Sequence, residues 1–382
     1  MKANITEKLK PIITKVKDAI SFKKPILAVD IGSSAIKSIR IKSEGNQYAA
    51  DFAAYKELDM RSISGDEEAM QIYMIGEIKK MLSDAKLKKS PIAIGISGSS
   101  VIVREAKLPA IGHQELERTL PFEAEPFIPY DIRDVNLDYY VIKEIVEENQ
   151  KKYDTVLVAA KKDLIDGRLS ILAQAGLRPI IVDVDAFAVT NLLSLVSDQQ
   201  SQQTTLMVNI GSTITNLVIV EDGTPRVVRD VNIGGNAFTN AIESSLGQDA
   251  QASEKMKRDS KINTGEDDKE GTLSSGEPAD TQASQCLITV ANELLAEVHK
   301  SIDFYLTHGM DREITKIYLS GGGALLKNLD AYLSKEFKLP VEILNPLSLL
   351  KIPPAYQNLI QAGPAFSVAC GLALRKYGDW QK

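Results

Sequence analysis

The chain has 382 residues, 44% apolar and 25% charged, which is the composition of a globular protein large enough for two to four compact units. It has no apolar run near the roughly 20 residues that cross a bilayer and no signal-peptide pattern, so we expect a cytoplasmic protein. Two distant cysteines argue against a disulfide framework, and a net charge of −6 argues against nucleic acid as the main partner.

Residues 1–23 combine lysines with apolar residues at helical spacing. Four isoleucines and valines between positions 12 and 20 follow Pro11, which suits a first helical turn. A basic amphipathic segment of this kind can make peripheral contact with an anionic membrane or dock on a partner. A frayed, solvated terminus explains the same residues, and both interpretations stay open.

The next segment predicts a strand, a phosphate-binding turn and a second strand. Ile26–Ile31 forms the first strand and is followed by Gly32, Ser33 and Ser34. Glycine lets the backbone approach a phosphate, and the serines offer amide and hydroxyl donors. Asp30, at the strand end, is placed to hold magnesium through water. A plain β-hairpin turn explains this motif when it is taken alone.

Residues 92–178 have a pattern of their own and predict an inserted subdomain. We expect one strand over Ile92–Leu108, a proline-interrupted helix, two further strands, and a helix that ends at Gly176. A strand over 179–184 then leads through Asp185 into another helix.

An internal repeat favours a duplicated fold. VNIGSTITNLVIV at 208–220 aligns without a gap with VDIGSSAIKSIRI at 29–41. Gly211, Ser212 and Thr213 thereby form a second turn of the same kind. Two matching turns on matching strand pairs predict two similar halves that face each other across a cleft. The glycine turn at Gly234 either supports the second turn or caps the helix that follows.

The last third of the chain contains a polar segment and a third glycine turn. Residues 258–284 have few apolar anchors and predict a mobile loop, followed by a long amphipathic helix. Gly321, Gly322 and Gly323 follow a strand and give a turn without side chains, where a base or ribose can lie. A structural strand–helix turn explains the same glycines.

These motifs, in this order, resemble the PilM family of actin-like proteins of type IV pilus assembly, and they are also similar to the division protein FtsA. The resemblance covers most of residues 24–376, and the insert LPFEAEPFIPYDIRDVNLDYYVI is its most specific part. It implies an α/β actin-like ATPase fold of two ribonuclease-H-like halves. The implied subdomains are 1A (24–91 and 179–203, with the crossing helix), 1C (92–178), 2A (204–237 and 312–361), 2B (238–311) and a C-terminal helix (362–382) that returns to 1A.

The resemblance also implies ATP with Mg²⁺ between the halves. The implied nucleotide contacts are Gly32, Ser33, Ser34, Lys37, Gly211, Ser212, Thr213 and Gly234 for the phosphates, Glu254 and Lys257 for the ribose, and Gly321, Gly322, Gly323 and Leu326 for the adenosine. Asp30 would meet the metal through water and Asp185 would position the attacking water. A solvated helix face explains Glu254 and Lys257, and a strand-end cap explains Asp185. Asn209 and Asn216 replace acids that are frequent in hydrolysing relatives, so we expect hydrolysis to be weak or absent.

For function, the resemblance implies a scaffold on the inner-membrane platform that recruits the cytoplasmic N-terminal peptide of a PilN-like membrane protein. The assembly ATPase, the platform protein and a second copy of the chain are further implied partners. A groove between 1A and 1C would hold the peptide. The candidate residues for contacting it are Phe122, Phe127, Ile128, Pro129 and Tyr130. Packing in a core would also explain these apolar residues. An FtsA-like division filament and a small-molecule kinase remain as alternatives.

Overall fold

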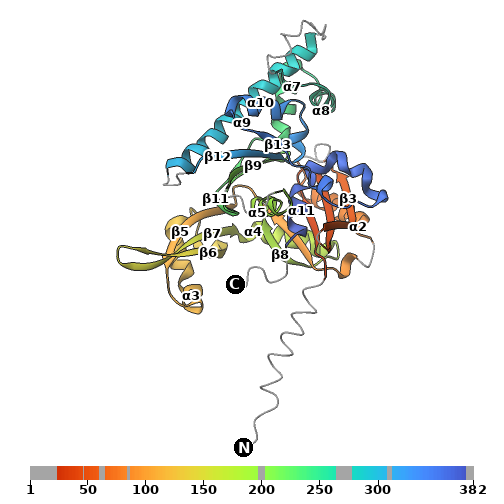
Figure 1. The fold of residues 1–382 in the computed structure, drawn as a ribbon. Coiled ribbons are helices and arrows are strands. Elements are labelled where there is room, and N and C mark those ends of the chain that lie inside the picture. Colours follow the sequence, from red (N-terminus) through yellow and green to blue (C-terminus); the bar gives the residue numbers. More distant parts are fainter. Residues whose placement is uncertain are drawn as a thin grey trace, which may run out of the picture.

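The computed structural model describes residues 24–45, 47–59, 65–83, 87–196, 203–263, 278–307 and 312–375. The predicted amphipathic segment 1–23 lies outside these residues. In the described part, the chain folds into two five-stranded sheets and one three-stranded sheet (Figure 1). No helix in that part is both long and apolar enough to span a membrane.

The first sheet has the strand order β3-β2-β1-β4-β8. Its strands are β1 (Leu27–Ile31), β2 (Ala35–Glu44), β3 (Gln47–Glu57), β4 (Ile92–Ile96) and β8 (Pro179–Val184). The first three form an antiparallel meander, and β4 and β8 continue the sheet in parallel to β1. All five residues of β1 are buried, as expected for a central strand that is covered on both faces.

Helices cover both faces of the first sheet. On one face, Ile78 of α2 (Glu67–Met81) and Leu172 of α4 (Lys162–Gln174) share a core with the β1 side chains. On the other face lie α5 (Asp185–Asn191) and α11 (Ser367–Ala373), whose alanines allow close packing. The C-terminal helix therefore returns to the first half of the molecule.

The second sheet, β11-β10-β9-β12-β13, repeats this arrangement. Its strands are β9 (Thr204–Ile210), β10 (Thr215–Glu221), β11 (Thr224–Val231), β12 (Ile314–Ser320) and β13 (Val341–Ile343). An antiparallel meander is again extended by two parallel strands. Its core is shared with α7 (Gly235–Leu246), α9 (Pro278–Thr307) and α10 (Leu329–Phe337). The duplication predicted from the repeated motif is confirmed.

The insert is a separate three-stranded sheet with its own apolar core. It contains β5 (Val101–Pro109), β6 (Val135–Glu147), β7 (Gln150–Lys161) and the helix α3 (His113–Ala124). The single strand predicted over Ile92–Leu108 is wrong. Gly98, with φ of +99°, breaks it into β4, which joins the first sheet, and β5, which joins the insert. The expected insert boundaries at 92 and 178 are therefore too wide, because β4 and α4 pack in the first half.

The predicted loop 258–284 is also too wide. The helix α8 (Ala250–Asp259) covers its beginning, and the helix α9 starts at Pro278. Ile262 is fully buried in the second core, and its backbone N–H donates to the Lys327 carbonyl at 3.0 Å. Ala283 is buried in the same core. The composition of this segment did not predict its buried residues, because each is a single apolar residue among polar ones. Residues 264–277 lie outside the described part.

The described part also contains one short α-helix and several 3-10 helices. They are the α-helix α6 (Leu193–Val196) and the 3-10 helices Leu87–Lys89, Glu125–Phe127, Ile132–Asp134, Gly322–Leu325, Pro346–Leu349 and Pro354–Phe366.

We predict that Ile262→Ala destabilises the protein by about 2–5 kcal/mol, because it leaves a cavity in a closed core. The control is Ile72→Ala on α2, where the side chain is 63% exposed and the change should stay within about 0.5 kcal/mol. Urea unfolding of both variants measures the difference. Equal stabilities would show that Ile262 does not anchor this segment.

Candidate nucleotide site

The two Gly-Ser turns meet where the halves face each other. The first turn joins β1 to β2 and is closed by a hydrogen bond from Gly32 N to the Ala35 carbonyl at 3.1 Å. The second joins β9 to β10 and is closed in the same way, from Gly211 N to the Ile214 carbonyl at 2.9 Å. The hydroxyl of Ser33 lies 2.5 Å from that of Ser212 and 3.0 Å from that of Thr213. Hydroxyl donors from both halves therefore converge on one point.

The glycines of this site are required by close backbone contacts. A Cβ on Gly211 would lie 2.8 Å from the Ile214 carbonyl oxygen, and one on Gly234 would lie 2.7 Å from the backbone of Ser212. The amides of Gly235 and Asn236 donate to the carbonyls of Gly211 and Ser212 at 2.8 and 2.7 Å. The turn at Gly234 thus braces the second Gly-Ser turn against the N-terminus of α7.

Asp30 and Lys37 form an ion pair beneath the first turn. They are cross-strand partners on β1 and β2, and Lys37 Nζ lies 2.9 Å from Asp30 Oδ2. Both side chains are largely buried, at 10% and 13% exposure. The pair offers one carboxylate to a hydrated cation and one ammonium to a phosphate. Among the described residues, no cluster of three or more His, Cys, Asp or Glu side chains is arranged to hold a metal by itself.

Asp185 begins α5 beside the Asp30–Lys37 pair. Ser97 Oγ donates to its Oδ2 at 2.6 Å, while its Oδ1 is buried and accepts no hydrogen bond. Burial raises the pKa of Asp185 to about 7, the negative charge of Asp30 adds to this shift, and the Ser97 hydrogen bond opposes it. A carboxyl with this pKa can exchange a proton at neutral pH. Gly95 makes room for it, because a Cβ there would lie 1.9 Å from Oδ1.

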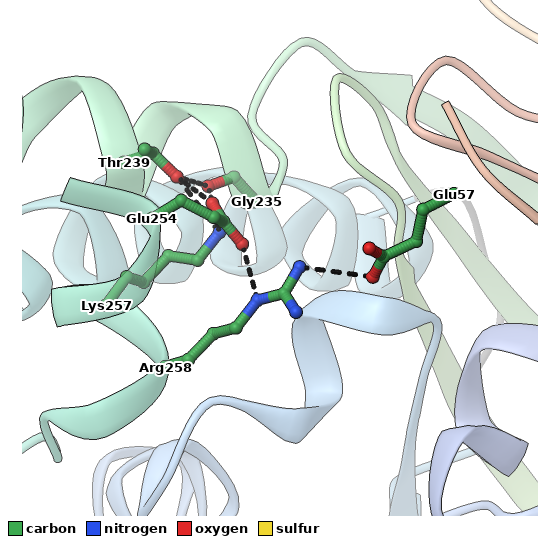
Figure 2. Close-up of polar contacts among 6 residues, drawn as sticks. All are labelled: Glu57, Gly235, Thr239, Glu254, Lys257 and Arg258. Carbon is green, nitrogen blue, oxygen red and sulfur yellow. Dashed lines mark hydrogen bonds and ion pairs between the residues drawn. The ribbon is translucent and has the colours of Figure 1, made fainter. Parts of the chain in front are cut away.

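Glu254 and Lys257 join a polar network next to the second turn (Figure 2). Lys257 Nζ donates to Glu254 Oε2 at 2.6 Å and to the Gly235 carbonyl at 3.1 Å. Thr239 also donates to Glu254, at 2.6 Å. Burial alone would raise the pKa of Glu254, but the bonds from Lys257 and Thr239 outweigh it and lower the pKa. The pair therefore lies next to the second Gly-Ser turn, and its contact with a ribose stays a prediction.

Arg258 extends this network across to the first half, and sequence reasoning missed it. Its Nε donates to Glu254 at 2.9 Å, and its other end reaches Glu57, at the end of β3, at 3.4 Å (Figure 2). The i,i+4 spacing from Glu254 to Arg258 was the available signal. The position of Glu57 opposite Arg258 is visible only in the tertiary structure.

The third glycine turn packs against the end of β9. A Cβ on Gly321, where φ is +80°, would lie 2.3 Å from the Ile210 carbonyl oxygen, and one on Gly323 would lie 2.2 Å from the Ile210 side chain. At Gly322 the nearest atom to a Cβ is 4.0 Å away. Gly322 is exposed, so a side chain at this position of the turn would extend into open space. Leu326 is buried in the second core, whereas its neighbour Leu325 is 48% exposed.

A buried polar chain runs beneath the second and third turns. Ser320 donates to Asn209 at 3.2 Å, Asn209 donates to Asn216 at 2.7 Å, and Asn216 donates to Asp230 at 2.7 Å. Asp230 also accepts the Gly98 amide at 2.6 Å. Asn209 is thus occupied by protein partners on both sides. Asp230 was not predicted, because nothing in a β-strand sequence marks a residue that faces another subdomain.

Of the residues expected to contact a partner, three are exposed and two are wholly or partly buried. Phe122 is 76% exposed, Phe127 is 36% exposed, and Pro129 is exposed. Ile128 is buried in the insert core, so it is not available to a partner as expected. Tyr130 is half-buried; its hydroxyl donates to the Ser99 carbonyl, and Lys161 Nζ lies 4.3 Å above its ring. Three of the five residues are therefore free to contact a partner.

We expect Asp185→Asn to change the pH dependence of stability. Ionised Asp185 destabilises the native state, and this cost grows as pH rises from about 4 toward about 7, the folded pKa. The variant should therefore gain stability relative to the native chain across that window, and the gain should reach about 4 kcal/mol above pH 7. Urea unfolding without nucleotide at several pH values tests this. Asp166→Asn, an exposed position on α4, is the control, and parallel pH profiles for Asp185→Asn and the native chain would contradict the assignment.

Comparisons with known proteins agree with this geometry. The family described as "Type IV pilus assembly protein PilM" matches residues 28–377. A structure titled "PilM-PilN type IV pilus biogenesis complex" is 28% identical, with a TM-score of 0.74, and covers 92% of this chain and 98% of that chain.

Two more distant structures share the fold alone. The ethanolamine utilization protein EutJ from Carboxydothermus hydrogenoformans is 14% identical, with a TM-score of 0.51 and coverage of 91% of this chain and 88% of its own. MreB 5 of Spiroplasma citri bound to AMPPNP is 14% identical, with a TM-score of 0.50 and coverage of 91% and 94%. The predicted actin-like ATPase fold is confirmed. With nearly its whole length matched, the chain belongs to the PilM family of type IV pilus assembly proteins.

Proposed function

We propose that this chain binds ATP with magnesium between its halves and, in that state, holds the cytoplasmic N-terminal peptide of a PilN-like protein at the inner-membrane pilus platform. The observation that carries the nucleotide part is the convergence of Ser33, Ser212 and Thr213 on one point. Two similar proteins support the proposed ligands. MreB 5 was solved with AMPPNP, and a PilM was solved as a complex with PilN.

The residues fit the phosphates and the metal. The turn amides and hydroxyls would bind phosphate oxygens, and Lys37 and Lys257 supply positive charge on either side. Magnesium keeps several waters and commonly uses one or two carboxylates together with phosphate oxygens, a set to which Asp30 contributes one carboxylate. When bound, the ion would supply positive charge against the phosphates; Asp30 would hold it through water, and Lys37 would offer its ammonium group to a phosphate oxygen.

The adenosine would lie against the third glycine turn. Gly322 is open, and Leu325 supplies exposed apolar surface beside it. On the opposite side, Glu254 is already ordered by Lys257 and Thr239, so its carboxylate is preorganised to accept the ribose hydroxyls.

The peptide would bind between the first half and the insert. The insert offers Phe122, Phe127 and Pro129, and the first sheet ends with β8, which exposes Ile180 and Val182. An extended peptide can pair with a sheet edge while its alternate side chains enter apolar pockets. Contacts of this kind suit the short cytoplasmic end of a membrane protein.

For the nucleotide, we predict that Gly322→Leu weakens ATP binding by about tenfold or more, or about 1.4 kcal/mol, because the side chain would occupy the base position. The fold should survive, since a Cβ at Gly322 meets open space. Gly321→Ala is the counterpart and should lower the melting temperature, because φ is +80° and the Ile210 carbonyl is too close. Calorimetry with ATP and Mg²⁺ and thermal unfolding without them distinguish the two. Unchanged ATP affinity in Gly322→Leu would remove the base from this turn.

For the peptide, we predict that Phe122→Glu weakens binding by about 2 kcal/mol, or roughly thirtyfold, as expected for a central aromatic contact. Stability should not change, because the side chain is 76% exposed. Ile72→Glu makes the same kind of substitution on α2 at a similarly exposed position. Fluorescence anisotropy with a labelled N-terminal peptide of the PilN-like protein measures both. Equal affinities would place the peptide elsewhere.

A further inference from the structure

The insert is joined to the first half by the chain and contacts both halves. Val101, Val156 and Ala160 of its strands share a core with the first half. It leaves the first sheet after β4 and returns before α4. In space, β5 of the insert lies against β11 of the second sheet (Figure 1). Two polar contacts fix this junction, one at Gly98 and one at Arg226.

Asp230 of β11 makes the first contact. Its two carboxylate oxygens accept the Asn216 amide and the Gly98 N–H at 2.7 and 2.6 Å. Burial raises the pKa of Asp230, and these two hydrogen bonds oppose that shift. Ser320, Asn209 and Asn216 each donate a hydrogen bond to the next residue in this network. Asp230 is therefore the acceptor at which the network ends.

Arg226 of β11 makes the second contact. Its Nη1 lies 3.5 Å from Asp154 Oδ2 on β7, and both side chains are buried, at 12% and 6% exposure. Lys143 lies 3.9 Å from the same oxygen. Glu105 faces Asp154 as well, and burial, then the Asp154 charge, raise the pKa of Glu105. Arg226 therefore supplies positive charge from the second half to a carboxylate pair of the insert.

The register of the second sheet links this junction to the nucleotide turns. Asn209, Asn216 and Asp230 are direct cross-strand partners on β9, β10 and β11. Asn209 and Asn216 lie two and three residues from the second Gly-Ser turn, Gly211–Thr213. On the other side, Gly98 follows Ser97, which holds Asp185 in the first half. Residues 97 and 98 thus contact an acid from each half.

We propose that Asp230 is a positioning residue that couples the nucleotide turns to the insert, so that nucleotide binding shifts the insert through the Gly98 hydrogen bond. This proposal rests on the proposed function, since the insert carries the peptide surface and the turns carry the nucleotide. The hydrogen-bonded strands form a rigid unit, so a displacement of the second turn relative to the first must also displace or strain Gly98. Coupling of this kind typically changes affinity 5- to 150-fold.

The test measures amide hydrogen exchange of the insert with and without AMPPNP and Mg²⁺. In the native chain, nucleotide should change the exchange rate of the Gly98 amide and of β5 by about fivefold or more. Asp230→Asn keeps the shape but leaves a single oxygen for two donors. It should bind AMPPNP within about threefold of the native affinity, while the insert no longer responds. Asp222→Asn, at the exposed tip of the same hairpin, is the matched control and should respond as the native chain does.

The outcomes separate this proposal from the nucleotide proposal. If the native chain binds AMPPNP and its Gly98 amide exchanges at an unchanged rate, the coupling is overturned and the nucleotide site stands. The same holds if Asp230→Asn responds like the native chain. If the native chain binds no nucleotide, both proposals are overturned. The Gly98 measurement needs no variant, so it decides the matter even if Asp230→Asn unfolds.

Discussion

The close approach of backbone to backbone at the three glycine turns is the constraint on which the site depends. The end of β9 is contacted from two sides, by Gly234 through the second turn and by Gly321 and Gly323 through the third. A single Cβ at any of these positions would lie under 3 Å from a neighbouring atom. Because these contacts leave the hydroxyls of Ser212 and Thr213 close to that of Ser33 in the first half, the two sheets can present donors to one ligand.

Negative charge in this site is distributed differently from what the two turn motifs suggest. The second half has an asparagine, Asn209, where the first half has Asp30, and the carboxylate lies two strands away at Asp230. An asparagine can donate and accept at once, so Asn209 and Asn216 can relay hydrogen bonds to Asp230 in one direction. An aspartate at Asn209 would place two acceptors against each other. The asparagines therefore belong to a structural network of hydrogen bonds, which keeps negative charge two strands away from the second Gly-Ser turn.

The insert is continuous in sequence with the first half but contacts both halves. Its own core makes it a compact unit, and Arg226 and Asp230 of β11 fix where that unit lies. Removing one partner of a buried ion pair leaves an uncompensated charge, so contacts such as Arg226–Asp154 constrain position more than they add stability. The second half thereby helps to fix the position of the exposed aromatic side chains of the insert.

By itself, the sequence determined the fold family, the duplicated halves and the three turns, because these depend on local patterns: apolar strands, glycines at fixed spacing and an aligned repeat. The turn motif and the repeat predicted that Ser33 and Ser212 face each other across a cleft, whereas Glu254 and Lys257 were assigned to the same site through family resemblance alone. It divided the chain wrongly at Ile92–Leu108 and at 258–284, where one left-handed glycine and two isolated apolar anchors decide the structure. Only the tertiary structure decided that Asp230 meets Gly98 and that Arg258 meets Glu57, because such contacts join residues more than a hundred positions apart and leave no periodic signal in the chain.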